Sequence, residues 1–384
     1  MNKLSKLLSL GFLGLSLSAF GQTEIEFENP RKISEDIDLE VTEVKNQAET
    51  GTCWSFSTTS FIESELIKKG KGVHNLSEMY NVRNVYPQKA ELYVKKHGRA
   101  QFGEGSLSHD VINSIREYGI VPESAYSGIT FGELHNHQEM INVLKKMLTA
   151  VVENKGGSIT PKWSEAFNAV LDVYLGKAPQ EFEYQGKTYT PKSFADYLDI
   201  NPDDYISLTS FTHQDFYDSF VLQVPDNFSN GEFYNLPLDE LMEVMDYALE
   251  NGYTISLDAD VSEEFFSAKT GMAILPAKDF DDMDEDEKEG VFKVNTPEVI
   301  VTPELRQMAY ENYETTDDHL MHLTGKGKDQ YGNPFYKVKN SWGTKGKGFE
   351  GYVYLSEAYM KMKTVSILLN KNALPKNIRK KLNV

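Results

Sequence analysis

The sequence predicts an α+β protein with two lobes, because helical patterns fill its first part and strand patterns its last part. The two kinds of element do not alternate, so a parallel sheet built from βαβ units is not expected. The chain has 384 residues, of which 40% are hydrophobic, 12% aromatic and 25% charged. This composition is typical of a soluble globular protein with a sizeable core, and it excludes coiled-coil, collagen-like and disordered classes.

Apolar residues at helical spacing predict helices over much of the chain. The helix that begins at Cys53 ends with two lysines and Gly70, which suit the negative end of a helix dipole and a helix stop. Pro237 and Asn251-Gly252 bracket another helix in the same way. The predicted helices are 53–70, 75–96, 108–118, 133–153, 163–175 and 237–250.

Strand patterns follow the last of these helices. Residues 253–257 alternate like a strand, and the stretches HLMHLTG, FYKVKNSW and GYVYLS beyond residue 317 are separated by glycine-rich turns. Residues 22–44 form an acidic, extended opening, and the composition of 176–235 predicts loops and short extended pieces. The charged run 278–290 predicts a solvated loop, because it lacks the glycine that an EF-hand calcium loop needs at its sixth position.

Residues 1–21 have the three parts of a secretory signal peptide. Two lysines precede an apolar run over 7–20, and Ala19-Phe20-Gly21 provides small residues for cleavage before Gln22. The apolar run is shorter than the ~20 residues that cross a bilayer, and no later run is long enough. We therefore expect a mature chain of residues 22–384 that is exported, to the periplasm or the exterior, and has no membrane span.

Charge and cysteine content exclude further classes. Asp plus Glu outnumber Lys plus Arg by 58 to 39, which gives a net charge of −19, and loss of Lys3 and Lys6 with the signal peptide would make the charge more negative. Such a surface repels phosphate backbones, so nucleic-acid binding is not expected. The single cysteine, Cys53, excludes an intramolecular disulfide and any multi-cysteine metal site.

The residues around Cys53 have the chemistry of a nucleophile site. A thiol in the first turn of a helix is expected to have its pKa lowered by the aligned backbone dipoles, and free N–H groups there can bind an oxyanion. Gln47 could supply a second donor to that oxygen, and Gly51 would allow a tight turn before the helix. The alternative is that Cys53 is a small buried apolar residue, which is its commonest role.

A thiolate nucleophile needs an imidazole, and that imidazole needs a group to orient it. Of eight histidines, only His319 and His322 are followed closely by the segment Asn-Ser-Trp-Gly at 340–343. On a strand these two histidines point to opposite faces, so only one can face the thiol. Asn340 could hydrogen-bond the ring, and Trp342 could shield that contact from water.

Two other histidine motifs have competing interpretations. His319-x-x-His322 and the acids before it could hold a metal, but no third ligand lies at a recognised spacing, so no metal site is expected. His135-Asn-His137 at the start of a predicted helix is interpreted as solvated polar surface. The Gly-Lys repeats near 325 and 346 lack the strand–loop–helix context of a phosphate-binding loop.

Taken in order, the glutamine, the Cys-Trp-Ser-Phe segment, the histidine and Asn-Ser-Trp-Gly resemble the papain superfamily of cysteine peptidases. His319 lies 266 residues after Cys53 and Asn340 lies 287 after it. Papain itself has a spacing of about 130–150, so the resemblance implies an insertion of about 120 residues, which we assign to roughly 130–235. The implied fold is papain-like, with a helical left lobe and a strand-rich right lobe.

The segments 76–80, 117–126, 175–198, 319–325 and 337–360 resemble the bleomycin hydrolase and bacterial aminopeptidase C branch. This resemblance implies that Cys53 is the nucleophile, His319 the general base and acid, Asn340 its orienting partner and Gln47 the oxyanion donor. His319 is preferred over His322 because His319-Leu320-Met321 matches the branch. Peptides are the implied substrates, no cofactor is needed, and a homo-oligomer is possible.

Two departures from the branch leave the specificity open. Where the branch has a paired-glycine substrate strand, this chain has Phe102-Gly103-Glu104-Gly105, and we assign Gly105, with Trp342, to substrate binding. The branch also has a C-terminal arm that captures the substrate's amino group, whereas only KNIRKKLNV follows Pro375 here. An aminopeptidase is therefore expected first, an endopeptidase with an open cleft second and an inactive papain-like binding module third.

Overall fold

The computed structural model describes residues 31–384, so the predicted signal peptide lies outside the described residues. The helices of this part of the chain are α1 (Cys53–Lys68), α2 (Glu78–Lys95), α3 (Ser108–Tyr118), α4 (Gln138–Val152), α5 (Lys162–Leu175), α6 (Pro191–Leu198), α7 (Leu238–Glu250), α8 (Glu285–Gly290), α9 (Pro303–Glu311), α10 (Glu357–Lys363) and α11 (Lys376–Leu382). Among residues 31–384, none of these helices has the length and apolar character that a bilayer crossing requires.

One large, mostly antiparallel sheet contains most of the strands, and its order is β5-β6-β4-β13-β7-β10-β11-β12-β9-β8, with β1 paired to β10. A separate hairpin joins β2 (Phe182–Tyr184) to β3 (Lys187–Tyr189). The strands of the large sheet are β1 (Ile33–Asp38), β4 (Tyr205–Thr209), β5 (Ser219–Val221), β6 (Glu232–Asn235), β7 (Ile255–Ala259), β8 (Phe266–Ser267), β9 (Met272–Ala273), β10 (His319–Asp329), β11 (Pro334–Lys339), β12 (Tyr352–Ser356) and β13 (Thr364–Asn370).

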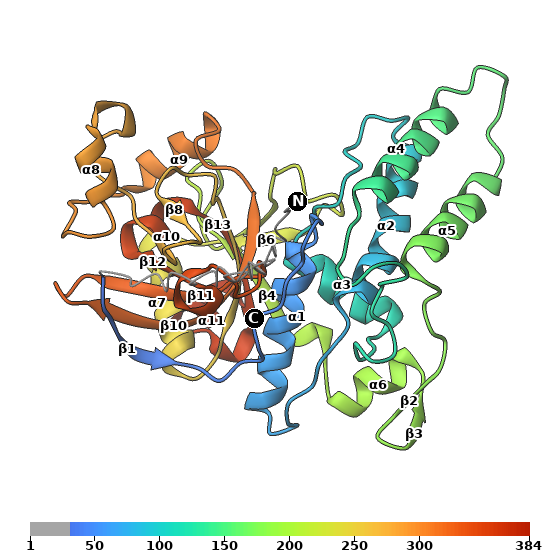
Figure 1. The fold of residues 1–384 in the computed structure, drawn as a ribbon, viewed down its shortest axis with the longest axis horizontal. Coiled ribbons are helices and arrows are strands. Elements are labelled where there is room, and N and C mark those ends of the chain that lie inside the picture. The colour runs from blue at the N-terminus through green and yellow to red at the C-terminus, as the bar shows by residue number, and fades with distance from the viewer. Residues whose placement is uncertain (1–30) are drawn as a thin grey trace, which may run out of the picture.

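Two lobes lie side by side, and α1 runs between them (Figure 1). Helices α2 to α6 form the helical lobe, while the sheet and α7 to α11 form the other lobe. Each lobe has its own apolar core: Phe61 and Tyr86 belong to the helical core, whereas Leu257 and Val338 pack under α7. Nearly all of α1 is buried because it contacts both lobes.

Small hydroxyl side chains fasten α1 to the sheet. The Ser57 hydroxyl donates to the Met321 carbonyl at 2.6 Å, and the Ser60 hydroxyl lies 2.9 Å from Nδ1 of His322. These contacts fix how far α1 is displaced along β10. The first residue of α1 and the first residue of β10 are therefore held at the same end of the interface between the lobes.

The six predicted helices and the four predicted strands are all present, with ends shifted by a few residues. The prediction for 176–235 was wrong in one place, because Pro191–Leu198 form α6, which Thr190 caps by accepting from the backbone N–H of Ser193. The prediction of a loop over 278–290 was also incomplete, since α8 begins there with Asp284 as its cap. In the predicted insertion, α4 and α5 pack against α2, whereas β4 and β6 lie within the large sheet. The bounds of the insertion stay a prediction.

Candidate active site

Cys53 is the first residue of α1, and its side chain is only 8% exposed. In the first turn of this helix, the backbone N–H of Trp54 hydrogen-bonds the Cys53 thiol, and the Ser55 N–H donates to the Thr52 carbonyl at 2.9 Å. Two contacts with Glu104 hold the segment around Cys53. The Gly51 N–H donates to the Glu104 carboxylate at 2.6 Å, and the Trp54 indole N–H donates to the Glu104 carbonyl at 2.9 Å.

His319 and Asn340 come together because β10 and β11 are antiparallel neighbours. His319 begins β10, Asn340 follows the end of β11, and Nε2 of His319 lies 2.8 Å from Oδ1 of Asn340. The same amide oxygen accepts from the Ser341 N–H at 2.7 Å, which fixes its orientation. The Trp342 ring lies 4.6 Å from the His319 ring, centroid to centroid, so Trp342 covers the predicted pair.

The structure also brings His319 to Cys53. The backbone N–H of Leu320, the residue after His319, hydrogen-bonds the Cys53 thiol. With Nε2 of His319 directed to Asn340, Nδ1 is the ring nitrogen left for the thiol. His322 is directed elsewhere, to Ser60 on α1, so the two histidines do not converge on one metal site. Among residues 31–384 no group of three or more His, Cys, Asp or Glu side chains is arranged to hold a metal ion.

Gln47 lies in the loop before α1 and is held by the segment that follows Asn340. Its backbone N–H donates to the Ser341 carbonyl at 2.8 Å, and its Oε1 accepts from the Ser341 hydroxyl. One hydrogen of its side-chain amide is donated to the Thr50 carbonyl at 2.7 Å. The orientation of the amide is thus fixed, and its second hydrogen is available to an oxyanion near Cys53.

Burial controls the protonation of both reacting groups. It raises the pKa of Cys53 to about 12, and the nearby charges of Asp226 and Asp258 add to this rise. It also lowers the pKa of His319 to about 4, although the hydrogen bond to Asn340 acts in the opposite direction. The predicted lowering of the thiol pKa was therefore wrong for this resting arrangement, because loss of solvation outweighs the helix dipole.

Gly105 lies beside this site, but a loop side chain covers it. The Asp226 carboxylate, from the loop between β5 and β6, is so close that a Cβ atom at Gly105 would lie 1.8 Å from Oδ2. The Gly105 carbonyl accepts a hydrogen bond from Lys89. Position 105 therefore requires glycine, because any larger side chain would clash with Asp226. The sequence analysis did not predict this contact.

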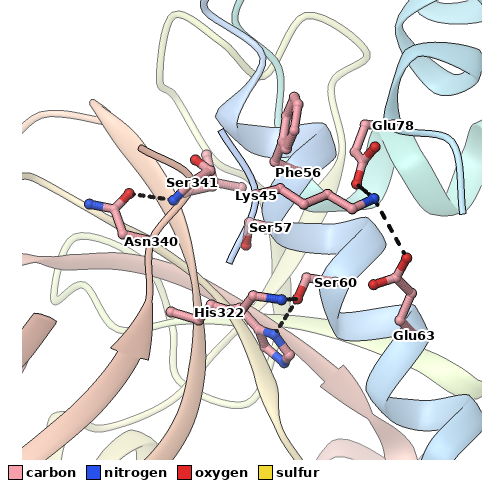
Figure 2. A pocket seen from close by; sticks show the side chains of 11 residues that line it. Lys45, Phe56, Ser57, Ser60, Glu63, Glu78, His322, Asn340 and Ser341 are labelled. Carbon is pink, nitrogen blue, oxygen red and sulfur yellow. Dashed lines mark hydrogen bonds and ion pairs between the residues drawn. The ribbon is translucent and has the colours of Figure 1, made fainter. Parts of the chain in front are cut away.

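A small polar pocket lies between α1 and the sheet, and Asn340 and Ser341 are part of its lining (Figure 2). Lys45 reaches between Glu63 and Glu78, with the Nζ–Oε1 distance to Glu63 at 3.9 Å. On the other side of the pocket, Ser60 links the buried His322 to Lys339, whose Nζ is 2.8 Å from the serine hydroxyl. These contacts join α1 to α2, β10 and β11 around the pocket.

Sequence reasoning missed Asp226 and Asp258 near the site, and it considered Asp317 only as a metal ligand and Glu104 only as part of the predicted substrate strand. Glu104 and Asp317 carried a local signal, since Glu104 stands between two glycines of the predicted substrate strand and Asp317 lies two residues before His319. The prediction that His135 and His137 are solvated surface was wrong, because His137 is 2% exposed and burial lowers the pKa of His135 to about 4.

A buried helix that begins with a cysteine, packed between a helical lobe and a mostly antiparallel sheet that carries a His–Asn pair, is the arrangement of a papain-like cysteine peptidase. Comparison with solved structures agrees: the crystal structure of PepW from Lactobacillus rhamnosis HN001 matches with a TM-score of 0.70 and 20% identity, covering 91% of this chain and 84% of that one. A model of the Peptidase C1-like family matches residues 94–384. The chain therefore belongs to the Peptidase C1-like family, and the predicted fold class is confirmed.

Relatives of known name place the chain in the aminopeptidase C branch. Aminopeptidase G of Lactobacillus delbrueckii subsp. lactis is 24% identical over 380 residues, which cover 88% of this chain and 83% of the relative. Aminopeptidase C of Streptococcus thermophilus is 23% identical over 413 residues, which cover 93% and 86%. The resemblance stated from the motifs is thus confirmed at the level of the branch, whereas the roles of single residues stay predictions.

Proposed function

We propose that the protein is an exported cysteine aminopeptidase that hydrolyses peptide bonds through a thioester on Cys53. The observation that carries this proposal is the 2.8 Å contact between Nε2 of His319 and Oδ1 of Asn340 beside the buried thiol. His319 takes the thiol proton, and the thiolate attacks the peptide carbonyl. The N–H of Cys53 and the free amide hydrogen of Gln47 stabilise the resulting oxyanion.

The remaining steps pass the thiol proton to the leaving amine and complete cleavage of the peptide bond. His319 gives the proton to the leaving amine, and the acyl group stays on Cys53 as a thioester. A water molecule, deprotonated by the same imidazole, then attacks the thioester carbonyl. The thiol is regenerated and the carboxylic acid leaves. Asn340 holds the imidazole throughout and favours its charged form.

The names of the relatives support aminopeptidase action. The C-terminal helix of this chain is docked on the sheet lobe, however, so another part of the protein has to recognise the free amino terminus of the substrate. In α11, Ile378 and Leu382 are buried against the sheet lobe, and Lys381 pairs with Glu240 of α7 at 2.7 Å. These contacts dock the last helix on α7. An endopeptidase with an open cleft is therefore the second candidate, and the two differ in their need for a free substrate amine.

Two fluorogenic peptides that differ only in a free or acetylated amino terminus test this proposal, with Cys53→Ala as the blank. We expect activity under reducing conditions, a preference for the free amine, and stoichiometric labelling of Cys53 by an epoxide inactivator. Equal cleavage of the acetylated peptide would favour the endopeptidase. Cleavage of neither peptide by correctly folded protein would leave the inactive binding module.

Export has its own test. Residues 1–21 carry the proposed signal, so the full-length chain expressed in a Gram-negative host should be found outside the cytoplasm with Gln22 as its first residue. A variant lacking residues 2–21 should stay in the cytoplasm. N-terminal sequencing of fractionated cells distinguishes the two, and an unprocessed cytoplasmic full-length chain would contradict export.

A further inference from the structure

Three aspartates from separate parts of the chain gather beside Cys53. Asp226 lies in the loop between β5 and β6, Asp317 lies just before β10, and Asp258 lies on β7 opposite Leu320. Oδ2 of Asp317 accepts from the Asp226 N–H at 3.1 Å. The charges of Asp226 and Asp258 both act on the Cys53 thiol, so this aspartate cluster borders the predicted nucleophile.

The carboxyl groups of the cluster lack a paired cation that would neutralise them when they ionise. Asp258 is 1% exposed, and its Oδ1 has no hydrogen-bond partner, while Oδ2 accepts from Ser366 at 3.1 Å. Lys89 is the cation that acts on Asp226, but its Nζ is bonded to the Gly105 carbonyl. Within residues 31–384, none of the three aspartates forms an ion pair with a lysine or arginine.

Asp226 and Asp317 are partly exposed, whereas Asp258 is buried behind them. Asp226 and Asp317 are therefore the members of the cluster that a ligand can reach from solvent. Burial raises the pKa of each of the three aspartates, and the charges of the other cluster members add to this rise for Asp258 and Asp317. A bound cation would relieve both effects, because an opposite charge favours the ionised carboxylates.

We propose that the aspartate cluster binds the α-ammonium group of the first residue of a peptide substrate, with Asp226 and Asp317 as its contacts. This inference rests on the proposed peptidase function and names what selects the amino terminus when α11 is docked on α7. A lysine side chain of a substrate also carries an ammonium group and is the alternative ligand for this cluster. The position of Asp226 favours the amino terminus.

Asp226 lies where a longer substrate would have to continue. Its carboxylate rests on the backbone of Gly105, the predicted substrate-pairing residue, and Oδ1 accepts from Gln101 at 3.3 Å. The buried Asn227 braces the loop, since its amide donates to the Leu222 carbonyl at 2.8 Å and to the Gly231 carbonyl at 2.9 Å. A peptide that extended past Gly105 would have to displace this loop, so the chain end is the part that meets Asp226.

Binding of the substrate's ammonium group to the cluster would also affect the ionisation of Cys53. Because Asp226 and Asp258 raise the pKa of Cys53, they disfavour the thiolate in the free enzyme. An ammonium group bound between the aspartates would offset that charge and favour the thiolate once the correct substrate is in place. Removing Asp226 should therefore weaken binding of the free amine and, at the same time, make the free enzyme's thiol more reactive.

The experiment compares wild type, Asp226→Asn and Asp317→Asn, with Asp218→Asn, an exposed aspartate nearby, as the matched control. The probes are an aminoacyl fluorogenic amide, its acetylated form, and an acetylated dipeptide amide with lysine at its first position. For Asp226→Asn we expect the ratio of kcat/KM for free over acetylated substrate to fall by about tenfold to a hundredfold, mainly through KM. Labelling of Cys53 by iodoacetamide should become faster.

Each outcome decides between stated alternatives. An equal loss on free and acetylated substrates, or slower labelling, would overturn the proposal and leave Asp226 a structural role. A selective loss on the lysine-containing acetylated dipeptide would mean that the cluster binds a basic side chain instead. Absence of cleavage by wild type would contradict the proposed function itself, whereas the labelling rates of the variants would still report the charge effect on Cys53. Thermal melting of each variant excludes misfolding.

Discussion

At the scale of single residues, the proposed proton transfer from Cys53 to His319 would have to work against burial. Each group alone favours its neutral form, since burial raises the pKa of Cys53 to about 12 and lowers the pKa of His319 to about 4. In the proposed mechanism, transfer of the thiol proton would create both charges together, so each would stabilise the other. Asn340 assists because its Oδ1 accepts from the imidazolium N–H.

Asn340→Ala tests this role. We expect kcat to fall between about tenfold and a thousandfold, because the imidazole loses its orientation and the hydrogen bond that favours its charge. KM should change little, since Asn340 is buried behind His319. Steady-state kinetics on the free-amine substrate measure both constants, and Asn377→Ala, an exposed position on α11, is the control. A raised KM with unchanged kcat would contradict this role.

The sequence allowed prediction of residues that stand in local motifs: His319 contacts Asn340, Gln47 contacts Ser341, and Leu320 contacts the Cys53 thiol, while the catalytic roles stay predictions. It did not allow prediction of the aspartate cluster, because its members come from three segments that only the fold joins. The direction of the thiol pKa was missed for a similar reason. A helix start is visible in a sequence, whereas the loss of solvation around a side chain is not.

At the scale of elements, the long helices and strands were predictable because their apolar residues repeat over several turns or pairs. The elements that were missed are short, and some follow each other without a turn residue. The helix α10 ends at Lys363 and β13 begins at Thr364, with no glycine or proline between them. A fully buried strand such as β13 has no alternation either, since all seven of its residues are buried.

The polar pocket beneath the site ties elements together through one cation. Lys45, before α1, contacts Glu63 on α1 and Glu78 at the start of α2, and all three are largely buried (Figure 2). In Lys45→Met the carboxylates would lose this charge, and we expect the free energy of unfolding to fall by about 3–5 kcal/mol. Urea denaturation at pH 7 measures it.

Lys32→Met, an exposed position, is the control for Lys45→Met. Adding Glu78→Gln to Lys45→Met should restore part of the loss, because it removes one of the unpaired carboxylates. A loss below about 1 kcal/mol, as for an exposed ion pair, would show that Lys45 does not hold these elements together.

At the scale of the whole molecule, an acidic chain folds with many carboxyls inside. The net charge is −19, and burial raises the pKa of several acidic side chains at once. Members of this group besides the aspartate cluster are Glu63, Glu65, Glu123, Asp260 and Glu298. A folded state that holds protons more tightly than the unfolded state is favoured by mild acid.

This arrangement predicts how stability changes with pH. Burial raises the pKa of Glu123 to about 8 and that of Asp317 to about 7. The stability from a raised carboxyl pKa is fully present below the unfolded value, near 4, and is lost as pH rises through the folded value. The buried histidines His135 and His319 act oppositely, but only below about pH 6.5, where the unfolded imidazole gains a proton.

Between pH 6.5 and 8 the two carboxyls therefore act without opposition from these histidines. We expect the free energy of unfolding to fall by about 1–2 kcal/mol across that range. Glu123→Gln keeps the neutral shape of the protonated acid, so it should remove most of this slope and be more stable than wild type at pH 8. Glu43→Gln, at an exposed position, removes one charge but should keep the slope. Urea denaturation of the three proteins at both pH values measures the effect, and a wild-type stability that is flat or rising over this range would mean that Glu123 and Asp317 ionise freely in the folded protein.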